Sequence, residues 1–227
     1  MTRICSLAAL ALFGATWANG GILTQVNTRA ALGGNDFVDW GQLGPDFTTV
    51  TSPFNVTSNL GLGPNAVVNG TQDFFSIQEG NTWGGNFAAG DNVLFNQASG
   101  PFTITFASPI HGAGLQFQSA TFGPFTASIT AFGAGNINFG TVTRTGTSSN
   151  AADNSAIFLG VISSLNDIVS LQFDLTIPSP LAPTEDPNGF GVNRLDLVDN
   201  QPTPEPSVIA LFSTGLGLFA LLRKGRP

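Results

Sequence analysis

The sequence is poor in charged residues, and this shortage limits what the protein can do. Charged residues make up 9% of the 227 positions, against roughly 25% in an average soluble domain. Apolar residues make up 42%, which is enough for the core of one domain, so a fully disordered chain is not expected. The folded surface must therefore be largely neutral and rich in hydroxyl and amide groups.

Cysteine is just as scarce, since Cys5 is the only one. It lies near the start of the apolar run 4–15, whereas a lipid-attachment cysteine would stand at the end of such a run. Removal of this N-terminal segment would leave no thiol, which excludes disulfides, thiolate metal sites and a cysteine nucleophile from the mature chain. Its stability must then come from packing and hydrogen bonds.

Basic residues are few, and most stand at the chain ends. Four of the seven are terminal, namely Arg3, Arg223, Lys224 and Arg226, and the other three are Arg29, Arg144 and Arg194. All fourteen carboxylates lie between Asp36 and Glu205, so a chain processed at both ends would carry fourteen acids against three bases, a net charge of −11. Because phosphate binding needs clustered Lys or Arg, nucleic acid is not an expected partner.

The N-terminus has the pattern of an export signal. Arg3 supplies the positive start, residues 4–15 the apolar stretch, and Thr16-Trp17-Ala18 a small-residue cleavage site. The run is too short for a membrane span and ends in Asn-Gly-Gly. We therefore expect residues 1–18 to be a signal helix that is cut after Ala18, and the protein to be exported.

Residues 19–199 are expected to form one all-β ectodomain, an antiparallel sandwich or jelly roll of about ten strands. The run 101–110 alternates apolar and hydroxyl residues, which puts one face on a core and the other in solvent. Residues 114–120 show the same alternation, with Gln116 and Gln118 on the polar face. The other predicted strands are 125–132, 136–145, 156–163, 168–177 and 190–198, with weaker signals in 46–58, 66–78 and 91–97.

The C-terminus has three parts in a fixed order. Residues 200–206 are a proline-rich linker, and 207–222 are sixteen uncharged residues that would span about 24 Å as a helix. Arg223, Lys224 and Arg226 follow at once, as the positive-inside rule expects of a cytoplasmic stop. We therefore predict a transmembrane helix over 207–222 and a basic cytoplasmic tail over 223–227.

The triplet Pro204-Glu205-Pro206, one apolar helix and a short basic end together resemble the PEP-CTERM sorting signal of exported bacterial proteins. The resemblance implies recognition by an exosortase, a membrane protease that cuts near the triplet in Gram-negative bacteria making exopolysaccharide. The ectodomain is also similar to a recurrent, mostly uncharacterised domain of such proteins, to which no activity is attached. That similarity rests on residues 38–45, 83–95, 100–119, 122–132, 153–161 and 190–197.

Two tryptophans in glycine-rich turns are the best candidates for contact with a ligand. Trp40 and Trp83 could stack on sugar rings if their indole faces are exposed, although the favoured interpretation is that both pack the sandwich. The polar residues near them in sequence that could bond sugar hydroxyls are Asp39, Gln42, Asn86 and Asp91.

Signals for an enzyme are thin, and we predict that the protein is not one. His111 is the only histidine and is expected in a surface turn, with no G-x-S-x-G motif or second histidine. Two acids about 5 to 10 Å apart could serve a glycosidase. The pairs that could do so are Asp36 with Asp39 and Asp73 with Glu79.

No cofactor is predicted, although calcium often cross-links the loops of exported sandwiches through carboxylates and carbonyls. Residues 151–156 and 184–189 would permit such a site, but no D-x-D-x-D-G loop is present.

The leading hypothesis is a non-enzymatic envelope or matrix protein in an exopolysaccharide or biofilm setting, first anchored by its C-terminal helix and then released or attached at the cell surface. A carbohydrate-binding module for matrix polysaccharide is the second hypothesis, and a hydrolase of that polysaccharide is the third.

Overall fold

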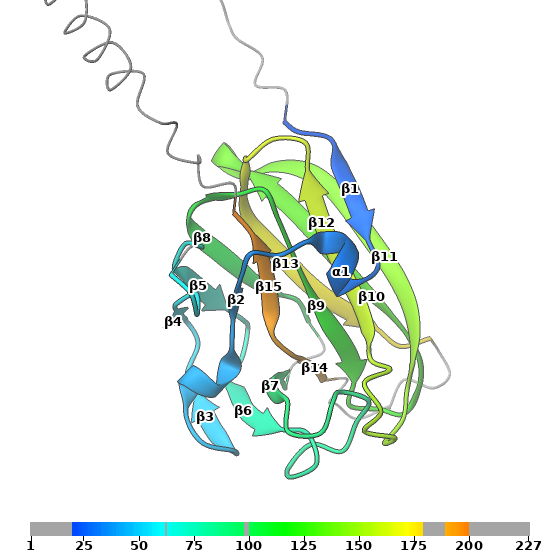
Figure 1. Ribbon diagram of the computed structural model, residues 1–227. Coiled ribbons are helices and arrows are strands. Elements are labelled where there is room, and N and C mark those ends of the chain that lie inside the picture. Colours follow the sequence, from blue (N-terminus) through cyan, green and yellow to red (C-terminus); the bar gives the residue numbers. More distant parts are fainter. Residues whose placement is uncertain (1–19, 62, 98–99, 179–188, 200–227) are drawn as a thin grey trace, which may run out of the picture.

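The computed structural model describes residues 20–61, 63–97, 100–178 and 189–199. These residues form 15 strands in two antiparallel sheets that face one another as a sandwich (Figure 1), so the predicted all-β class is confirmed. Within these ranges, no helix has the length and apolarity that crossing a membrane would need. The predicted helices at 1–18 and 207–222 lie outside the described residues.

The first sheet has nine strands. Its main path is β1 (Leu23–Val26), β12 (Ile157–Ser163), β9 (Gly112–Ser119), β14 (Phe190–Val192), β7 (Asn92–Asn96), β6 (Phe74–Gln78) and β3 (Thr48–Val50), while β15 (Leu195–Val198) joins β9 to β2 (Asp36–Val38). The strand count exceeds the prediction because several of these strands have only three or four residues, too few for a visible alternation.

The second sheet has six strands, in the order β11 (Ile137–Ser148), β10 (Gly123–Gly133), β13 (Ile168–Thr176), β8 (Phe102–Ile110), β5 (Ala66–Asn69) and β4 (Phe54–Val56). Three short helical turns complete the described residues: α1 (Arg29–Leu32), η1 (Trp40–Leu43) and η2 (Ala134–Asn136).

Residues 190–198 are two strands rather than the single strand predicted. Both β14 and β15 pair with the same edge of β9, but Val192 faces Phe117 while Asp196 faces Gly114. Four residue steps from Val192 to Asp196 therefore match three steps from Phe117 to Gly114 on β9. One extra residue on one strand is what defines a β-bulge. The interruption falls at Asn193, whose side chain accepts a hydrogen bond from Gln116 N at 3.1 Å.

Phenylalanine rings from both sheets meet in the core between them. Phe102 of β8 stacks on Phe173 and Phe190, with ring centroids 5.2 and 5.6 Å away, and meets the edge of Phe74 at 5.5 Å. All four side chains are at most 1% exposed. Alternation in β8 was therefore read correctly, because Phe102, Ile104 and Phe106 are buried while Thr105 is exposed.

The outer face of β9 does not reach solvent, which corrects the expectation for Gln116 and Gln118. These side chains do point away from the core, yet they are only 5% and 1% exposed. Bonds from residues 86 and 148–156 cover them. On the neighbouring β12, α1 packs Leu32 against Phe158. The polar face of this sheet is thus a second, hydrogen-bonded interior.

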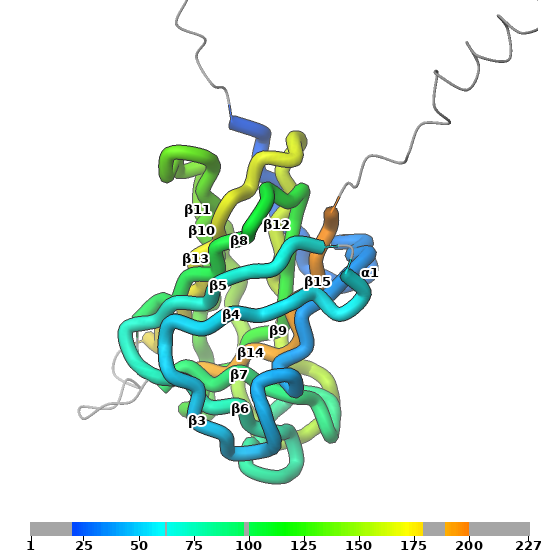
Figure 2. Tube along the Cα trace, turned by 90° about the vertical axis from the view of Figure 1, so that its left-hand side faces the viewer, coloured from blue at the N-terminus to red at the C-terminus, as the bar shows by residue number. Residues whose placement is uncertain are grey.

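The first and last described residues lie at one end of the sandwich, which we call the terminal end (Figures 1 and 2). Ser164 N donates to Ile22 O, Ser163 N to His111 O, and His111 N to Val198 O, at 2.8 to 3.0 Å. These bonds join the start of β1, the β12–β13 turn, the β8–β9 turn and the end of β15. The loops 79–91, 120–122 and 149–156 lie at the opposite end, which we call the loop end.

Removing the central ring of the core should cost a large part of the stability. We expect Phe102→Ala to lower the free energy of unfolding by about 3–5 kcal/mol, because it deletes a fully buried aromatic side chain. Phe122→Ala, in the β9–β10 turn and 56% exposed, is the matched control and should change it by about 0.5 kcal/mol or less. Denaturant titration measures both, and equal losses would contradict this description of the core.

Candidate functional site

Trp40 is fully buried and cannot present a ring face to a sugar, so this part of the sugar-binding prediction is wrong. Asp39 begins the turn η1 by accepting a hydrogen bond from Gly41 N at 2.7 Å. The turn directs the indole into the core, where its Nε1 donates to Asn193 O at 2.8 Å. Trp40 therefore packs the sandwich, which was the other interpretation of its sequence context.

Trp83 is also buried, with 8% of its surface exposed, and the sugar-binding prediction fails here as well. Its ring lies tilted against Phe95 at 5.2 Å and Phe87 at 6.5 Å. Its Nε1 donates to Gln118 Oε1 at 3.3 Å. Because both the faces and the polar edge have partners, Trp83 anchors the 79–91 loop to β9.

The polar residues predicted beside the tryptophans have structural partners. Asp39 accepts from Asn92 Nδ2 at 2.9 Å, and Gln42 bridges to Thr57 through N–H and hydroxyl bonds of 2.9 and 3.1 Å. Asn86 accepts from Ser149 N at 2.6 Å, so it holds the 149–156 loop. These side chains fix turns and do not converge on an open sugar site.

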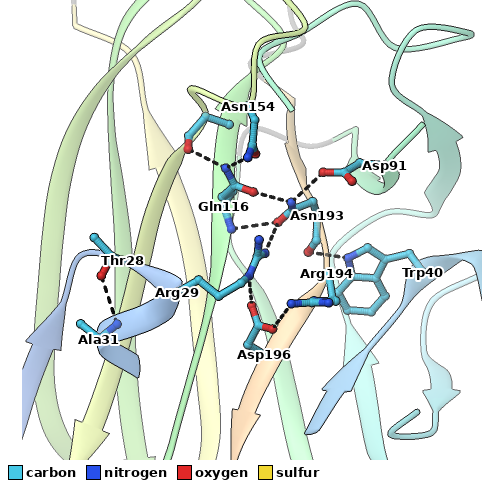
Figure 3. A network of polar contacts seen from close by, with 11 residues as sticks. Thr28, Arg29, Ala31, Trp40, Asp91, Gln116, Asn154, Asn193, Arg194 and Asp196 are labelled. Atoms are coloured by element: carbon cyan, nitrogen blue, oxygen red, sulfur yellow. Dashed lines mark hydrogen bonds and ion pairs between the residues drawn. The ribbon is translucent and has the colours of Figure 1, made fainter. Parts of the chain in front are cut away.

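Asn193 is the hub that sequence reasoning missed (Figure 3). Its Nδ2 donates to Gln116 Oε1 at 2.6 Å and to Asp91 Oδ2 at 3.0 Å, and its Oδ1 accepts from Gln116 N at 3.1 Å and Arg29 Nη2 at 3.4 Å. The predicted candidates Trp40 and Asp91 are thus linked through one residue, Trp40 by the main-chain carbonyl of Asn193 and Asp91 by its side-chain amide. A polar residue inside the apolar run 190–198 was the available sequence signal.

Two arginines meet at one buried carboxylate beside this hub. Asp196 pairs with Arg29 Nε and, at 2.8 Å, with Arg194 Nη2, while its side chain is only 6% exposed (Figure 3). Arg29 is placed by α1, which Thr28 caps through its Oγ1 and Ala31 N at 3.1 Å. Since two guanidinium groups share one carboxylate, the cluster keeps one net positive charge.

A polar cavity of about 280 Å³ opens beside Arg29, over the outer face of β9 and β12. Its polar lining consists of amide, hydroxyl and guanidinium groups, and no carboxylate is among its lining residues. Those residues are Asn27, Thr28, Arg29, Gln116, Arg144, Asn154, Ser155, Ala156, Ile157 and Phe158.

Arg144 reaches this cavity from the other sheet. It lies on β11, the edge strand of the six-stranded sheet, and its Nη1 donates to Asn27 O at 2.5 Å and Phe158 O at 2.6 Å. These two bonds hold the edge of one sheet against β12 and the β1–α1 connection of the other. Of the three arginines in the described residues, two therefore line one cavity, and the third shares Asp196 with one of them.

A pair of glycines makes room for Phe158, which lines the cavity. Gly114 of β9 faces Gly160 of β12 in register, and a Cβ on Gly114 would lie 2.7 Å from both Gly160 Cα and the Phe158 ring. The absence of both side chains therefore lets the Phe158 ring approach the two strands closely. The guanidinium carbon of Arg29 then sits 5.6 Å from the centroid of that ring.

The acids of the pairs considered for a glycosidase accept hydrogen bonds from backbone amides. Asp36 accepts from Leu60 N and Gly63 N at 2.8 and 2.7 Å, and Asp73 from Ser52 N at 3.1 Å. Glu79, 2% exposed, accepts from Gly85 N at 2.8 Å and Phe87 N at 3.2 Å. Each of the carboxylates ties a loop to the sandwich.

His111 lies in the β8–β9 turn, as predicted, but it is half-buried, and its Nδ1 is buried without a partner among the described residues.

Of the two segments that could permit calcium, only 151–156 lies wholly within the described residues. In 151–156, Asp153 accepts from Ser155 N at 3.1 Å and Ser155 Oγ at 2.6 Å, which closes the turn on itself. The described ranges contain no group of three acidic, histidine or cysteine side chains placed to hold a metal ion. Residues 184–188 lie outside the described residues, as do Pro204, Glu205, Pro206 and the basic residues Arg223, Lys224 and Arg226.

No family model matches this chain, and no curated protein matches it either. Among solved structures, it is similar to a DUF4465 family protein from Bacteroides caccae, with 10% identity and a TM-score of 0.42 over 72% of this chain and 99% of that one. It is also similar to the catalytic domain of a GH87 α-1,3-glucanase in complex with tetrasaccharides, with 11% identity and a TM-score of 0.24. The match covers 83% of this chain and 31% of the glucanase domain. At these TM-scores neither similarity supports an inference about function.

The amide bonds to Asp36 should make folding sensitive to acid. Burial alone raises the pKa of Asp36, but the N–H groups of Gly63, Leu60 and Phe37 together outweigh it and lower the pKa to about 2. A lowered pKa stabilises the fold above about pH 4, by about 2 kcal/mol, and this stability is lost as the pH falls towards 2. We expect Asp36→Asn to be less stable at pH 7 and to lose less stability between pH 5 and pH 2.

Asp174→Asn is the control of opposite sign, because burial raises the pKa of Asp174. Because the buried carboxylate destabilises the fold at pH 7 and this penalty is relieved by protonation, Asp174→Asn should gain stability at pH 7 and lose at least as much stability as the unmodified protein between pH 5 and pH 2. Denaturant titrations at a series of pH values measure both variants. If Asp36→Asn lost as much unfolding free energy between pH 5 and pH 2 as the unmodified protein, the assigned role of Asp36 would be contradicted.

Proposed function

We propose that the protein is a non-enzymatic component of the cell envelope or extracellular matrix, exported by its signal peptide and sorted through a PEP-CTERM tail. The observation that carries this proposal is the order of the tail: a Pro-Glu-Pro triplet, sixteen uncharged residues and a basic end. In support, β15 ends at Val198, and only the linker 200–206 separates the sandwich from the apolar segment. The partners would be an exosortase-type protease and the membrane.

An apolar surface at the terminal end supports a position close to the bilayer. Ile22, Ile137 and Leu165 are 77%, 45% and 51% exposed. Ile137 and Leu165 line one cavity of about 280 Å³ together with Phe139 and Val169, and Ile22 is hydrogen-bonded to Ser164 beside them. Seven linker residues reach at most about 25 Å. A membrane helix over 207–222 would therefore keep this surface near the lipid headgroups.

The carboxylates support a non-enzymatic role, because the pairs considered for hydrolysis hold loop amides. Binding of matrix polysaccharide remains the second proposal, but Trp40 and Trp83 cannot carry it. A hydrolase remains the third, with no described residue in its favour.

The triplet should decide how the tail is processed. In a host with a working exosortase, mass spectrometry of the mature protein should find a C-terminus near Pro206, and a variant with Pro204, Glu205 and Pro206 all changed to alanine should retain Pro227. Pro202→Ala, in the same linker, is the control and should be processed normally. If the unmodified protein from such a host still ended at Pro227, the sorting proposal would be contradicted.

The terminal end should contact lipid while the chain is anchored. We expect a fluorophore on Leu165→Cys, in the full chain reconstituted from a host without an exosortase, to be quenched by nitroxide-labelled lipid headgroups. The same label on Phe122→Cys, similarly exposed at the loop end, should be quenched several-fold less. Equal quenching of the two labels would contradict this orientation.

A further inference from the structure

We propose that the cavity lined by Arg29 and Arg144 binds a sugar acid, a saccharide unit that carries one carboxylate among neutral hydroxyls. This inference does not rest on the sorting proposal, since every residue of the cavity belongs to the sandwich. It also concerns a site distinct from the turns that hold Trp40 and Trp83, since the indoles of both residues are buried.

The charge of the cavity is the first argument. Fourteen carboxylates against three arginines outside the chain ends make a uniformly acidic protein, yet the cavity has two arginines and no carboxylate in its lining. Arg29 is partly neutralised by Asp196. No carboxylate of the described residues lies within 4 Å of the Arg144 guanidinium. Arg144 is therefore the uncompensated cation of this surface.

The donors of Arg144 are the second argument. Its two hydrogen bonds to Asn27 O and Phe158 O both use Nη1. Among the described residues Nε and Nη2 have no acceptor, and neither is a buried atom, so both meet solvent. These two nitrogens form the edge of the guanidinium that pairs with both oxygens of a carboxylate. Because the two Nη1 bonds fix the side chain, little of its conformational freedom remains to be lost on binding.

The remaining lining fits hydroxyl groups. The Nδ2 of Asn154 and the Nη1 of Arg29 are further donors without a partner among the described residues, and Asn27, Thr28 and Ser155 add amide and hydroxyl groups that can donate and accept. A volume of about 280 Å³ is at the lower limit for small-molecule sites. The size suits a single sugar ring rather than a long chain segment buried along its length.

The surrounding charge limits the ligand to one carboxylate. A polyanion would extend beyond the cavity over a protein with a net negative charge, and Asp153 is hydrogen-bonded to Ser155 of the lining. Repulsion of this kind grows with each added anionic group, whereas a single carboxylate is compensated by Arg144. A uronate unit within an otherwise neutral glycan satisfies both the local cation and the acidic surroundings.

The test is a titration of the full chain in detergent micelles with sodium glucuronate, glucose, sodium acetate and sodium sulfate. Calorimetry gives the affinities, and the ¹H–¹⁵N signal of Arg144 Nε–H, assigned by its loss in Arg144→Gln, reports the contact directly. We expect glucuronate to bind at least about tenfold more tightly than each of the other three probes and to shift this signal. Added salt should weaken glucuronate binding and leave glucose binding unchanged.

Variants separate binding from folding. Arg144→Gln should reduce glucuronate affinity about tenfold or more. Since Arg144 also joins two sheet edges, Asn154→Gly is the second variant: Asn154 has φ +60°, which glycine adopts freely, so the turn is kept while the amide is lost. We expect a several-fold weaker affinity from it. Arg194→Gln removes an equal charge from outside the cavity lining and should change the affinity less than twofold.

Three results would overturn the proposal. Equal affinities for glucose and glucuronate would show that the carboxylate is not recognised. Sulfate or acetate binding as tightly as glucuronate would show a site for bare anions only. Glucuronate binding that is unchanged in both Arg144→Gln and Asn154→Gly would place the ligand elsewhere. None of these results bears on cleavage of the tail, so the two proposals fail independently.

Discussion

The side chain of Asn193 lies where β14 gives way to β15 along the edge of β9, and the turns and strands of the nine-stranded sheet are held around it. Two strands, β14 and β15, share the edge, and one extra residue between them leaves Gln116 N without a ladder partner. Asn193 Oδ1 accepts that bond. A buried amide that is left unpaired costs about 1–3 kcal/mol, so the bulge is tolerated because the amide replaces the missing main chain. The same residue then fixes Trp40 and reaches Arg29.

Buried polar bonds take over the role that disulfides have in many exported domains. After export this chain would contain no thiol, and its long loops are tied by single carboxylates and amides instead. Glu79 holds two amides of the 79–91 loop, and Gln118 binds that loop and the 149–156 loop at once. Because each bond is short and local, several of them are needed to hold one loop. This explains why so many Asn, Gln and Asp side chains are buried in a protein with little surface charge.

The parts of the fold that could be predicted are the strands with a long apolar alternation. Residues 102–106 and 168–176 show this pattern, whereas 157–163 is a nearly continuous apolar run, and both signals depend only on neighbours in the sequence. The tail and the export signal are contiguous patterns too, and they stay predictions because both lie outside the described residues. The outer face of β9 could not be predicted, since Gln116 looks like a solvent-facing residue in any strand. Its burial comes from loops that are 30 or more positions away.

The burial of the tryptophans and the grouping of the arginines could not be established from the sequence, because both depend on contacts between distant segments. Trp40 lies in a glycine-rich turn, which allows exposure, but a turn whose first residue caps it with a carboxylate can also direct the ring inward. Conversely, the few arginines carry no motif. Arg144 meets Asn27 across 117 positions only because the sandwich closes one pair of sheet edges.

Arginine is well suited to joining two sheet edges in this way. Its fork can bridge two carbonyls from different strands with one nitrogen and still present two others outward. In a sequence with so few cations, the place where Arg144 joins the two sheets is thereby also a place where a guanidinium has no carboxylate partner among the described residues. Structural and recognition roles then converge on the same residue, because the bonds that hold Arg144 are also the bonds that orient it.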